Sequence, residues 1–263
     1  MERYNKLVEH IKKLESVVVA FSGGVDSTLV LKAAKDALGD KVVALTIHAP
    51  FHLNWEIKEA KEIAEKLGVR HEIIEFGDIM PEIIDNPSDR CYLCKKKVFQ
   101  VIKDFAENEG IVYVLDGTNA DDDKDYRPGL KALRELNVLS PLQSVKITKA
   151  EVRSVSKKLE LETWDKPAYA CILSRIEYGQ RIKEEDLRKI EEGELYLMGI
   201  GFSTVRIRLH GQLARIEVAE QDLARLLTPK IYRQVNNELK SLGFSYVTVD
   251  LEGYRMGSQN EVL

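Results

Sequence analysis

Residues 22–27, with the sequence SGGVDS, have the types and spacing of a phosphate-binding turn. They follow the apolar run VVVAF and precede TLVLKAAKDAL, so the turn joins a predicted strand to a predicted helix. Glycines let an anion approach the unpaired N–H groups of a helix start, where the helix dipole is positive. The alternative is a tight turn without a ligand. The residues that would supply backbone and hydroxyl donors are Ser22, Gly23, Gly24, Val25 and Ser27.

The same turn lacks the lysine that a Walker phosphate loop carries, and it contains the acid Asp26. A carboxylate repels phosphate unless a cation lies between the two groups. If the turn binds phosphate, a cation must therefore lie beside Asp26.

The chain has three cysteines, Cys91, Cys94 and Cys171. An odd number in a chain of intracellular character argues against a disulfide framework and raises the question of metal ligation. Cys91 and Cys94 form a CxxC motif at the start of a predicted helix, which suits a zinc half-site, an iron–sulfur site, a redox pair or two unconnected residues. With Cys171, the set suits a four-iron cluster with one iron left open, because such clusters ordinarily have four thiolates. A zinc site completed by histidine is the alternative, although no histidine stands nearby at a standard spacing.

Further polar residues follow the predicted strands. The stretch DGTNADD comes at the end of the apolar run IVYVL, the last of four strands predicted below. In a doubly wound parallel sheet, ligands lie at the carboxyl ends of the strands. The acid run from Asp121 to Asp125 is by itself typical of a solvated loop. Arg127 is predicted either to face a phosphate or to pair with those acids.

Arg206 and Arg208 alternate in a later predicted strand and would present two guanidinium groups to a phosphate or carboxylate. The alternative is a solvated strand face. Glu194 and Glu217 are predicted either to bind a metal or to have no ligand.

The elements that must position these residues alternate between strand and helix in the first part of the chain. Apolar runs at SVVVAF, KVVALTIH, RHEIIEF and IVYVLDGTN predict four strands, with helical patterns between them. Strands alternating with helices indicate βαβ units, so we predict an α/β domain over residues 1–166 with a doubly wound parallel sheet. Its last helix starts at a predicted capping box, from Thr148 to Glu151.

For residues 167–263 the pattern predicts a smaller α+β domain. It contains a helix, a hairpin from FSTVRIRLHG to QLARIEVA, a further helical segment and a final strand. No run approaches the roughly 20 apolar residues that span a bilayer, so we expect a cytoplasmic protein without a membrane partner. The net charge of −4 argues against general coating of nucleic acid, although a local patch such as LCKKK remains available.

The SGGVDS turn behind VVVAF resembles the PP-loop of ATP pyrophosphatases. In that class the loop binds the pyrophosphate half of ATP, and cleavage between the α- and β-phosphates passes AMP to an acceptor oxygen. The resemblance implies that Asp26 binds Mg²⁺ and that the backbone of ALTIHA, which includes Thr46, passes over adenine. The residues that match the class near the nucleotide are Gly117, Thr118, Asn119 and Asp122.

Within that class, KPAYACILSRIEYGQRI, DYRPG, VRIRLHGQLARIEV and the terminal DLEGYRMGSQNE resemble the LarE family of ATP-dependent sulfur transferases. The resemblance runs from the loop to the last residues. It implies that the substrate is pyridinium-3,5-biscarboxylic acid mononucleotide, whose carboxylates are adenylated and converted to thiocarboxylates for the nickel-pincer cofactor. The residues that look like catalytic or anion contacts are Cys171, Ser174, Arg175, Arg255 and Ser258.

Well-known family members use one cysteine, matching Cys171, which gives up its own sulfur. The CYLC motif departs from them and resembles a subgroup in which three cysteines hold a [4Fe-4S] cluster and external sulfide is the donor. The expected cofactors are thus ATP, Mg²⁺ and this cluster, and a homo-oligomer is expected. Two alternatives remain: a PP-loop enzyme that thiolates tRNA, and a nucleotide-binding protein with a structural zinc site and no turnover.

Overall fold

The computed structural model describes residues 1–122, 129–167 and 170–255. The chain divides into two compact units, which are described separately. Unit 1 contains Met1–Asp78 and Asp89–Tyr169, and unit 2 contains Ile79–Ser88 and Ala170–Leu263. In the described residues, no helix combines the length and the apolar character needed to cross a bilayer.

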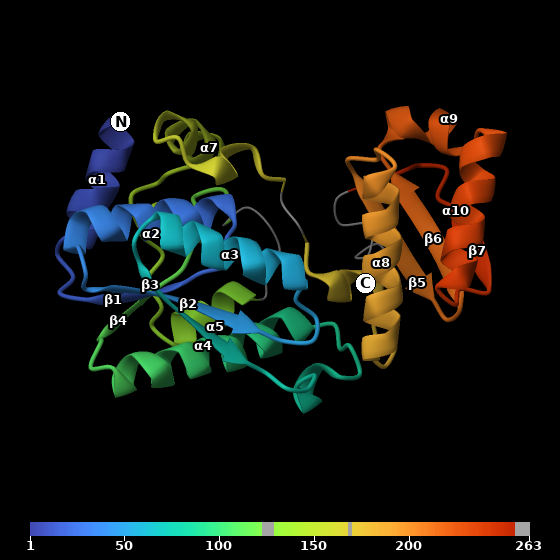
Figure 1. Ribbon diagram of the computed structural model, residues 1–263. Helices are drawn as coiled ribbons and strands as arrows, with labels where there is room; N and C mark the ends of the chain where they lie inside the picture. Colours follow the sequence, from blue (N-terminus) through green and yellow to red (C-terminus); the bar gives the residue numbers. More distant parts are fainter. Residues whose placement is uncertain (123–128, 168–169, 256–263) are drawn as a thin grey trace. The chain divides into compact units, whose positions relative to one another are not determined.

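Unit 1 is built on a parallel sheet of four strands (Figure 1). They are β1 (Val17–Ala20), β2 (Val42–His48), β3 (Arg70–Glu75) and β4 (Tyr113–Leu115), in the order β3-β2-β1-β4. The valine-rich β1 is central because its side chains are buried on both faces, as a parallel sheet covered by helices requires. The edge strand β3 has charged residues at both ends and is only half-buried between them. The predicted α/β fold is confirmed.

Helices cover both faces of this sheet (Figure 1). One face packs on α4 (Arg90–Asn108) and α5 (Gly129–Glu135). The other face packs on α1 (Glu2–Ile11), α2 (Val25–Leu38), α3 (Asn54–Lys66) and α7 (Lys149–Lys158). Helix α2 is buried almost all round, as its apolar sequence predicts, because α1 and α7 cover the side that faces away from the sheet.

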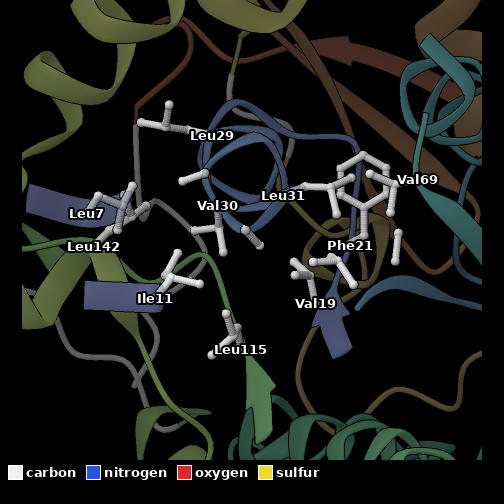
Figure 2. Packing of buried hydrophobic residues seen from close by; sticks show 14 of the residues in the cluster. Leu7, Ile11, Val19, Phe21, Leu29, Val30, Leu31, Val69, Leu115 and Leu142 are labelled. Atoms are coloured by element: carbon white, nitrogen blue, oxygen red, sulfur yellow. The ribbon is translucent and has the colours of Figure 1, made fainter. Parts of the chain in front are cut away.

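Figure 2 shows the core between the sheet and α2. Val19 of β1 and Phe21 just beyond it lie near Leu31 of α2, while Leu7 of α1 packs on the far side. Full burial of one such side chain contributes about 1.5–3 kcal/mol. This packing holds the start of α2 against the end of β1, which is where the glycine turn lies.

Three local details differ from the sequence-based expectation. Strand β4 is only three residues long, shorter than the run IVYVLDGTN that predicted it, and Pro141 starts a short helix, α6 (Pro141–Ser144), that was not predicted. Proline suits the first turn of a helix because its missing N–H would be unpaired there anyway. Helix α5 was not expected from the pattern. The capping box at Thr148 and Glu151 is confirmed.

Unit 2 is α+β, as predicted. It contains α8 (Glu184–Gly199), β5 (Val205–His210), β6 (Leu213–Val218), α9 (Leu223–Leu226), α10 (Pro229–Ser241) and β7 (Tyr246–Val249). Strands β5 and β6 form the expected antiparallel hairpin, and β7 pairs parallel to β6.

The segment Ile79–Ser88 lies within the predicted first domain but packs with unit 2. The side chain of Asn86, fully buried, donates hydrogen bonds to the carbonyls of Ile176 and Glu177, at 3.0 and 2.7 Å. Its own carbonyl accepts the N–H of Gly179. Asn86 has a φ of +49°, a conformation that asparagine tolerates better than most residues. The chain therefore leaves unit 1, contributes to unit 2 and returns just before Cys91.

Candidate active site

The loop between β1 and α2 depends on Gly23. Its φ of +67° is left-handed, and a Cβ there would lie 3.1 Å from the Cβ of Ala60 on α3, so conformation and space both require glycine. Gly24 is the N-cap of α2, and no side chain caps the N–H groups of that first turn. Those groups have no partner within the helix and form an anion-binding surface. Val25 is 4% exposed, so only its backbone is available to a ligand.

The two serines close the loop on itself. Ser27 Oγ donates to the carbonyl of Gly24 at 3.2 Å, and it lies 3.1 Å from Ser22 Oγ. Because the single Ser27 proton goes to the carbonyl, Ser22 donates to Ser27. Ser22 is the exposed member, so a phosphate can reach its hydroxyl, which would then turn from Ser27 and donate to the phosphate instead.

Asp26 is held from two directions. The Nδ2 of Asn119 donates to one carboxylate oxygen at 3.3 Å, and the ammonium of Lys149 pairs with the other. The structure thus brings together Asp26 and Asn119, which were predicted from separate motifs. The carboxylate is one-fifth exposed and lies beside the helix start.

The stretch after β4 approaches the same helix start. A Cβ on Gly117 would lie 3.0 Å from the N of Ser27, so glycine permits this close approach. Thr118 donates its hydroxyl hydrogen bond to Asp116 and is buried. Asp122 accepts the backbone N–H of Asn119 at 2.9 Å and is buried, which fixes the turn that aims Asn119.

Thr46 uses its side chain within the fold. Its hydroxyl donates to the carbonyl of Phe21 at 2.7 Å and lies 2.8 Å from Nε2 of His71. Since the hydroxyl proton goes to the carbonyl, His71 donates from Nε2. Burial lowers the pKa of His71 and favours this neutral form. Thr46 can therefore meet a nucleotide only through its backbone.

Two lysines that were not predicted from the sequence contact the loop. Lys149 pairs with Asp26, and Lys166 donates to the carbonyl of Gly23 at 3.2 Å while pairing with Glu59 at 2.5 Å. The sequence did indicate that a cation is needed, because the loop contains an acid and no lysine of its own. The sequence distance of more than 100 residues hides which lysine supplies it.

The single carboxylate of the loop, Asp26, suits the binding of Mg²⁺. Magnesium usually keeps several waters and binds through one or two carboxylates plus substrate phosphates, so the single carboxylate of Asp26 is a sufficient protein share. In the described part of the chain, no group of three or more ligating side chains forms a complete metal cage.

In unit 2, Arg175 organises the segment that carries Cys171. Its guanidinium forms a bidentate pair with Glu194, at 2.9 and 3.0 Å, and donates to the carbonyls of Ala170 and Cys171 and to the hydroxyl of Ser174. It is 3% exposed. Glu194 thus binds arginine and the N–H of Ile207. Arg175 is placed to fix the backbone around Cys171.

Arg206 and Arg208 are buried, so the alternative of a solvated strand face is wrong. Arg208 forms a bidentate pair with the fully buried Glu217, both bonds at 3.0 Å, and donates to the carbonyl of Ser174. Arg206 has no carboxylate ion pair with any described residue; it donates to its own chain and stacks on the ring of Tyr254 at 5.2 Å. Burial, and then the nearby Arg175, lower the pKa of Arg206.

Three predicted residues remain, Arg255, Arg127 and Ser258. Arg255 pairs with Glu252 at 2.6 Å. Arg127 and Ser258 lie outside the described residues.

The cysteines occupy both units. Cys91 and Cys94 are one helical turn apart near the start of α4 in unit 1, so their thiols point to one side of that helix. Cys171 is exposed in unit 2, at the N-cap of the 3₁₀ turn η4 (Ile172–Arg175). None of the three forms a disulfide. A cluster held by all three cysteines stays a prediction.

The parallel sheet, the glycine turn with an internal acid and the helix behind it define a PP-loop enzyme of the ATP-using class. The family model for NAD synthase matches residues 3–103. The fold is also similar to the NH₃-dependent NAD synthetase of Campylobacter jejuni, with a TM-score of 0.50, 18% identity and coverage of 91% of this chain and 93% of that chain.

Two relatives match almost the whole chain. The pyridinium-3,5-bisthiocarboxylic acid mononucleotide synthase of Lactiplantibacillus plantarum is 40% identical over 259 residues, covering 98% of this chain and 93% of that protein. An uncharacterized protein of Synechocystis, slr1717, is 39% identical over 262 residues, covering 99% and 98%. The chain belongs to the LarE family, which includes the first of these relatives.

Proposed function

We propose that this protein is an ATP-dependent sulfur transferase that acts on pyridinium-3,5-biscarboxylic acid mononucleotide in nickel-pincer cofactor biosynthesis. It adenylates a substrate carboxylate, releases pyrophosphate, and then replaces AMP by sulfur to form a thiocarboxylate. The observation that carries the proposal is the similarity along 98% of the chain to a synthase named for the bisthiocarboxylic acid product.

The order of these two steps follows from the chemistry. A carboxylate is a poor electrophile because its leaving group would be oxide, whereas an acyl adenylate loses AMP readily. In the first step a carboxylate oxygen attacks the α-phosphorus and the bond to the β-phosphate oxygen breaks. In the second step a sulfur nucleophile attacks the acyl carbon, and the bond to AMP breaks. A thiolate or sulfide suits this attack because it is already ionised near neutral pH.

In unit 1, the proposed ATP site consists of the loop and the stretch after β4. The N–H groups of the first turn of α2 and the hydroxyl of Ser22 would bind the departing pyrophosphate. Asp26 would hold Mg²⁺, which when bound neutralises the charge that develops on the phosphates. Asn119 keeps Asp26 in place.

In unit 2, Arg206 is the proposed contact for a phosphate or carboxylate of the substrate. It is buried and carries no carboxylate ion pair among the described residues, so an anion would complete its environment. Arg208 and Arg175 are instead assigned to holding the backbone of Ser174 and Cys171, because both have carboxylate partners.

For sulfur delivery, Cys91, Cys94 and Cys171 are the proposed ligands of a [4Fe-4S] cluster. When bound, such a cluster supplies an iron that can carry an additional sulfide. The alternative donor is Cys171 itself, which would lose its sulfur.

The test is incubation of anaerobically purified protein with ATP, Mg²⁺ and the dicarboxylate mononucleotide. Pyrophosphate and thiocarboxylate are measured, together with the mass of the protein. We expect several turnovers at unchanged protein mass; a protein lighter by one H₂S would instead identify Cys171 as a sacrificial donor. Cys91→Ser and Cys94→Ser should retain pyrophosphate release and lose thiocarboxylate. Pyrophosphate release with tRNA, and none with the mononucleotide, would refute the proposal.

A further inference from the structure

Asn86 lies in the segment that leads the chain back to the CxxC motif, and it is bound there through both its side chain and its backbone. Its side chain is 0% exposed and donates to the carbonyls of Ile176 and Glu177, at 3.0 and 2.7 Å. Its backbone carbonyl accepts the N–H of Gly179 at 2.9 Å. One residue thus binds three positions of the stretch that follows Cys171.

These hydrogen bonds lie among buried apolar residues. Ile83 and Ile176 are 0% exposed, and Ile182 is 2% exposed. The carbonyl of Ile84 adds a further bond, because it accepts the N–H of Ile182 at 2.7 Å. Removing the Asn86 amide would take a donor from carbonyls that little water can reach, and such a loss costs more than an exposed bond.

The stretch that Asn86 binds is itself held as far back as Cys171. Ile176 bridges to Leu209 of β5. The preceding residue, Arg175, donates to the carbonyl of Cys171 at 3.1 Å. Asn86 is therefore bound to a part of unit 2 whose backbone is fixed up to the cysteine.

The sequence positions make this contact important for the thiols. Asn86 stands five positions before Cys91, and Ile176 stands five positions after Cys171. Each of these stretches spans at most about 18 Å when fully extended. Along the chain alone, 80 positions separate the two cysteines. The hydrogen bonds of Asn86 replace that long path by two short ones, which lowers the entropic cost of bringing the thiols together.

We propose that Asn86 is a positioning residue for the cysteines. By fixing the segment before the CxxC motif on the stretch after Cys171, it holds Cys91 and Cys94 within reach of Cys171. This inference rests on the proposed function, because the three thiols serve one reaction only if the protein transfers sulfur.

The test measures the proximity of two thiols in protein without a cluster. In a Cys94→Ser background, Cys91 and Cys171 are the two remaining cysteines, and both are exposed. Dibromobimane loses one bromide to the first thiol and then either loses the second bromide to the other thiol or leaves that thiol to another reagent molecule. Intact mass spectrometry gives the ratio of bridged to doubly labelled protein, which reports the effective concentration of one thiol at the other.

Asn86→Gly should lower that ratio by about tenfold to a hundredfold, because two hydrogen bonds are lost while glycine accepts the φ of +49°. The N–H of Gly179 should exchange with deuterium faster by a similar factor. The matched control is Asn137→Gly, at an exposed asparagine of unit 1 with a φ of +53°. It should keep the ratio within about twofold of the background protein.

A second control separates positioning from stability. Leu239→Ala removes a side chain of α10 that is 0% exposed, so it destabilises unit 2 away from Asn86. Its ratio should also stay within about twofold of the background protein. Absence of bridging in the background protein, an unchanged ratio in Asn86→Gly, or an equal fall in Leu239→Ala would overturn the inference.

The labelling reaction contains neither ATP nor the mononucleotide. Failure of the sulfur-transfer assay would leave a positive bridging result standing, and absence of bridging would leave the proposed adenylation standing.

Discussion

Arg206 and Arg208 provide a test of whether a buried arginine is retained for binding or for stability. Both lie on β5, both are buried, and both point to the same side of the strand. They differ in one respect: Arg208 has a bidentate carboxylate partner, and Arg206 has no carboxylate ion pair with a described residue. We compare Arg208→Met with Arg206→Met.

The structure sets the expected magnitudes. Removing Arg208 takes away the bidentate partner of Glu217, which is 0% exposed and which Arg215, one-third exposed, also contacts at 3.2 Å. Breaking a buried pair in this way costs about 3–5 kcal/mol of unfolding free energy. Arg206→Met removes a desolvated cation and loses its stacking on Tyr254, worth about 2 kcal/mol for a desolvated arginine. The two changes nearly cancel, so its stability should stay within about 1 kcal/mol of the wild type.

The assay is urea unfolding followed by circular dichroism at equal protein concentration. Tryptophan fluorescence is unsuitable, because Trp55 and Trp164 both lie in unit 1. Binding of the mononucleotide is measured in parallel, and Arg206→Met should lose it while remaining folded. If Arg206→Met is destabilised as much as Arg208→Met, then Arg206 is a structural residue and the argument for an anion site fails.

Three further predictions concern unit 1. Burial, and then the nearby His48, lower the pKa of His52 to about 4. Between pH 6.5 and 4, His52 is therefore protonated in the unfolded chain and neutral in the folded protein. Stability should fall by about 3 kcal/mol as pH falls through that window, and His52→Asn, which keeps an acceptor for a backbone N–H, should flatten the slope of urea midpoints against pH. Gly23→Ala should abolish ATP binding in calorimetry and destabilise more than Gly68→Ala, which has a similar positive φ but open space and should cost only about 1 kcal/mol; equal effects of the two would contradict the close contact. Thr148→Ala should cost about 0.5–2 kcal/mol in thermal unfolding through the lost cap, and no change would show that the capping box is unimportant.

Local patterns were sufficient to predict much of the fold. The buried run of β1, the glycine turn and the capping box at Thr148 are each decided by residues within a few positions of one another. The hairpin of β5 and β6 is local for the same reason. The docking of Ile79–Ser88 on unit 2 is not local, because it depends on the carbonyls that Asn86 meets about 90 residues later.

Charge pairing in unit 2 shows a second limit. In the strand register Arg206 stands opposite Glu217, so a direct cross-strand pair would be expected between them. The carboxylate instead takes the diagonal neighbour Arg208, which stands opposite Arg215, and binds both of these arginines. One carboxylate thus satisfies two cations and leaves Arg206 without it. The sequence contains these residues but not the choice of partner.

The SGGVDS loop shows why a motif alone is an incomplete description of such a site. Its backbone provides donors, but its one charged side chain is negative. The positive groups come from Lys149, placed by a capping box, and from Lys166, which lies 143 residues after Gly23 in the sequence and donates to its carbonyl. Loss of either lysine would leave the motif intact and change the charge balance at the phosphates. Function in this class therefore has to be inferred from the loop together with the cations that the fold brings to it.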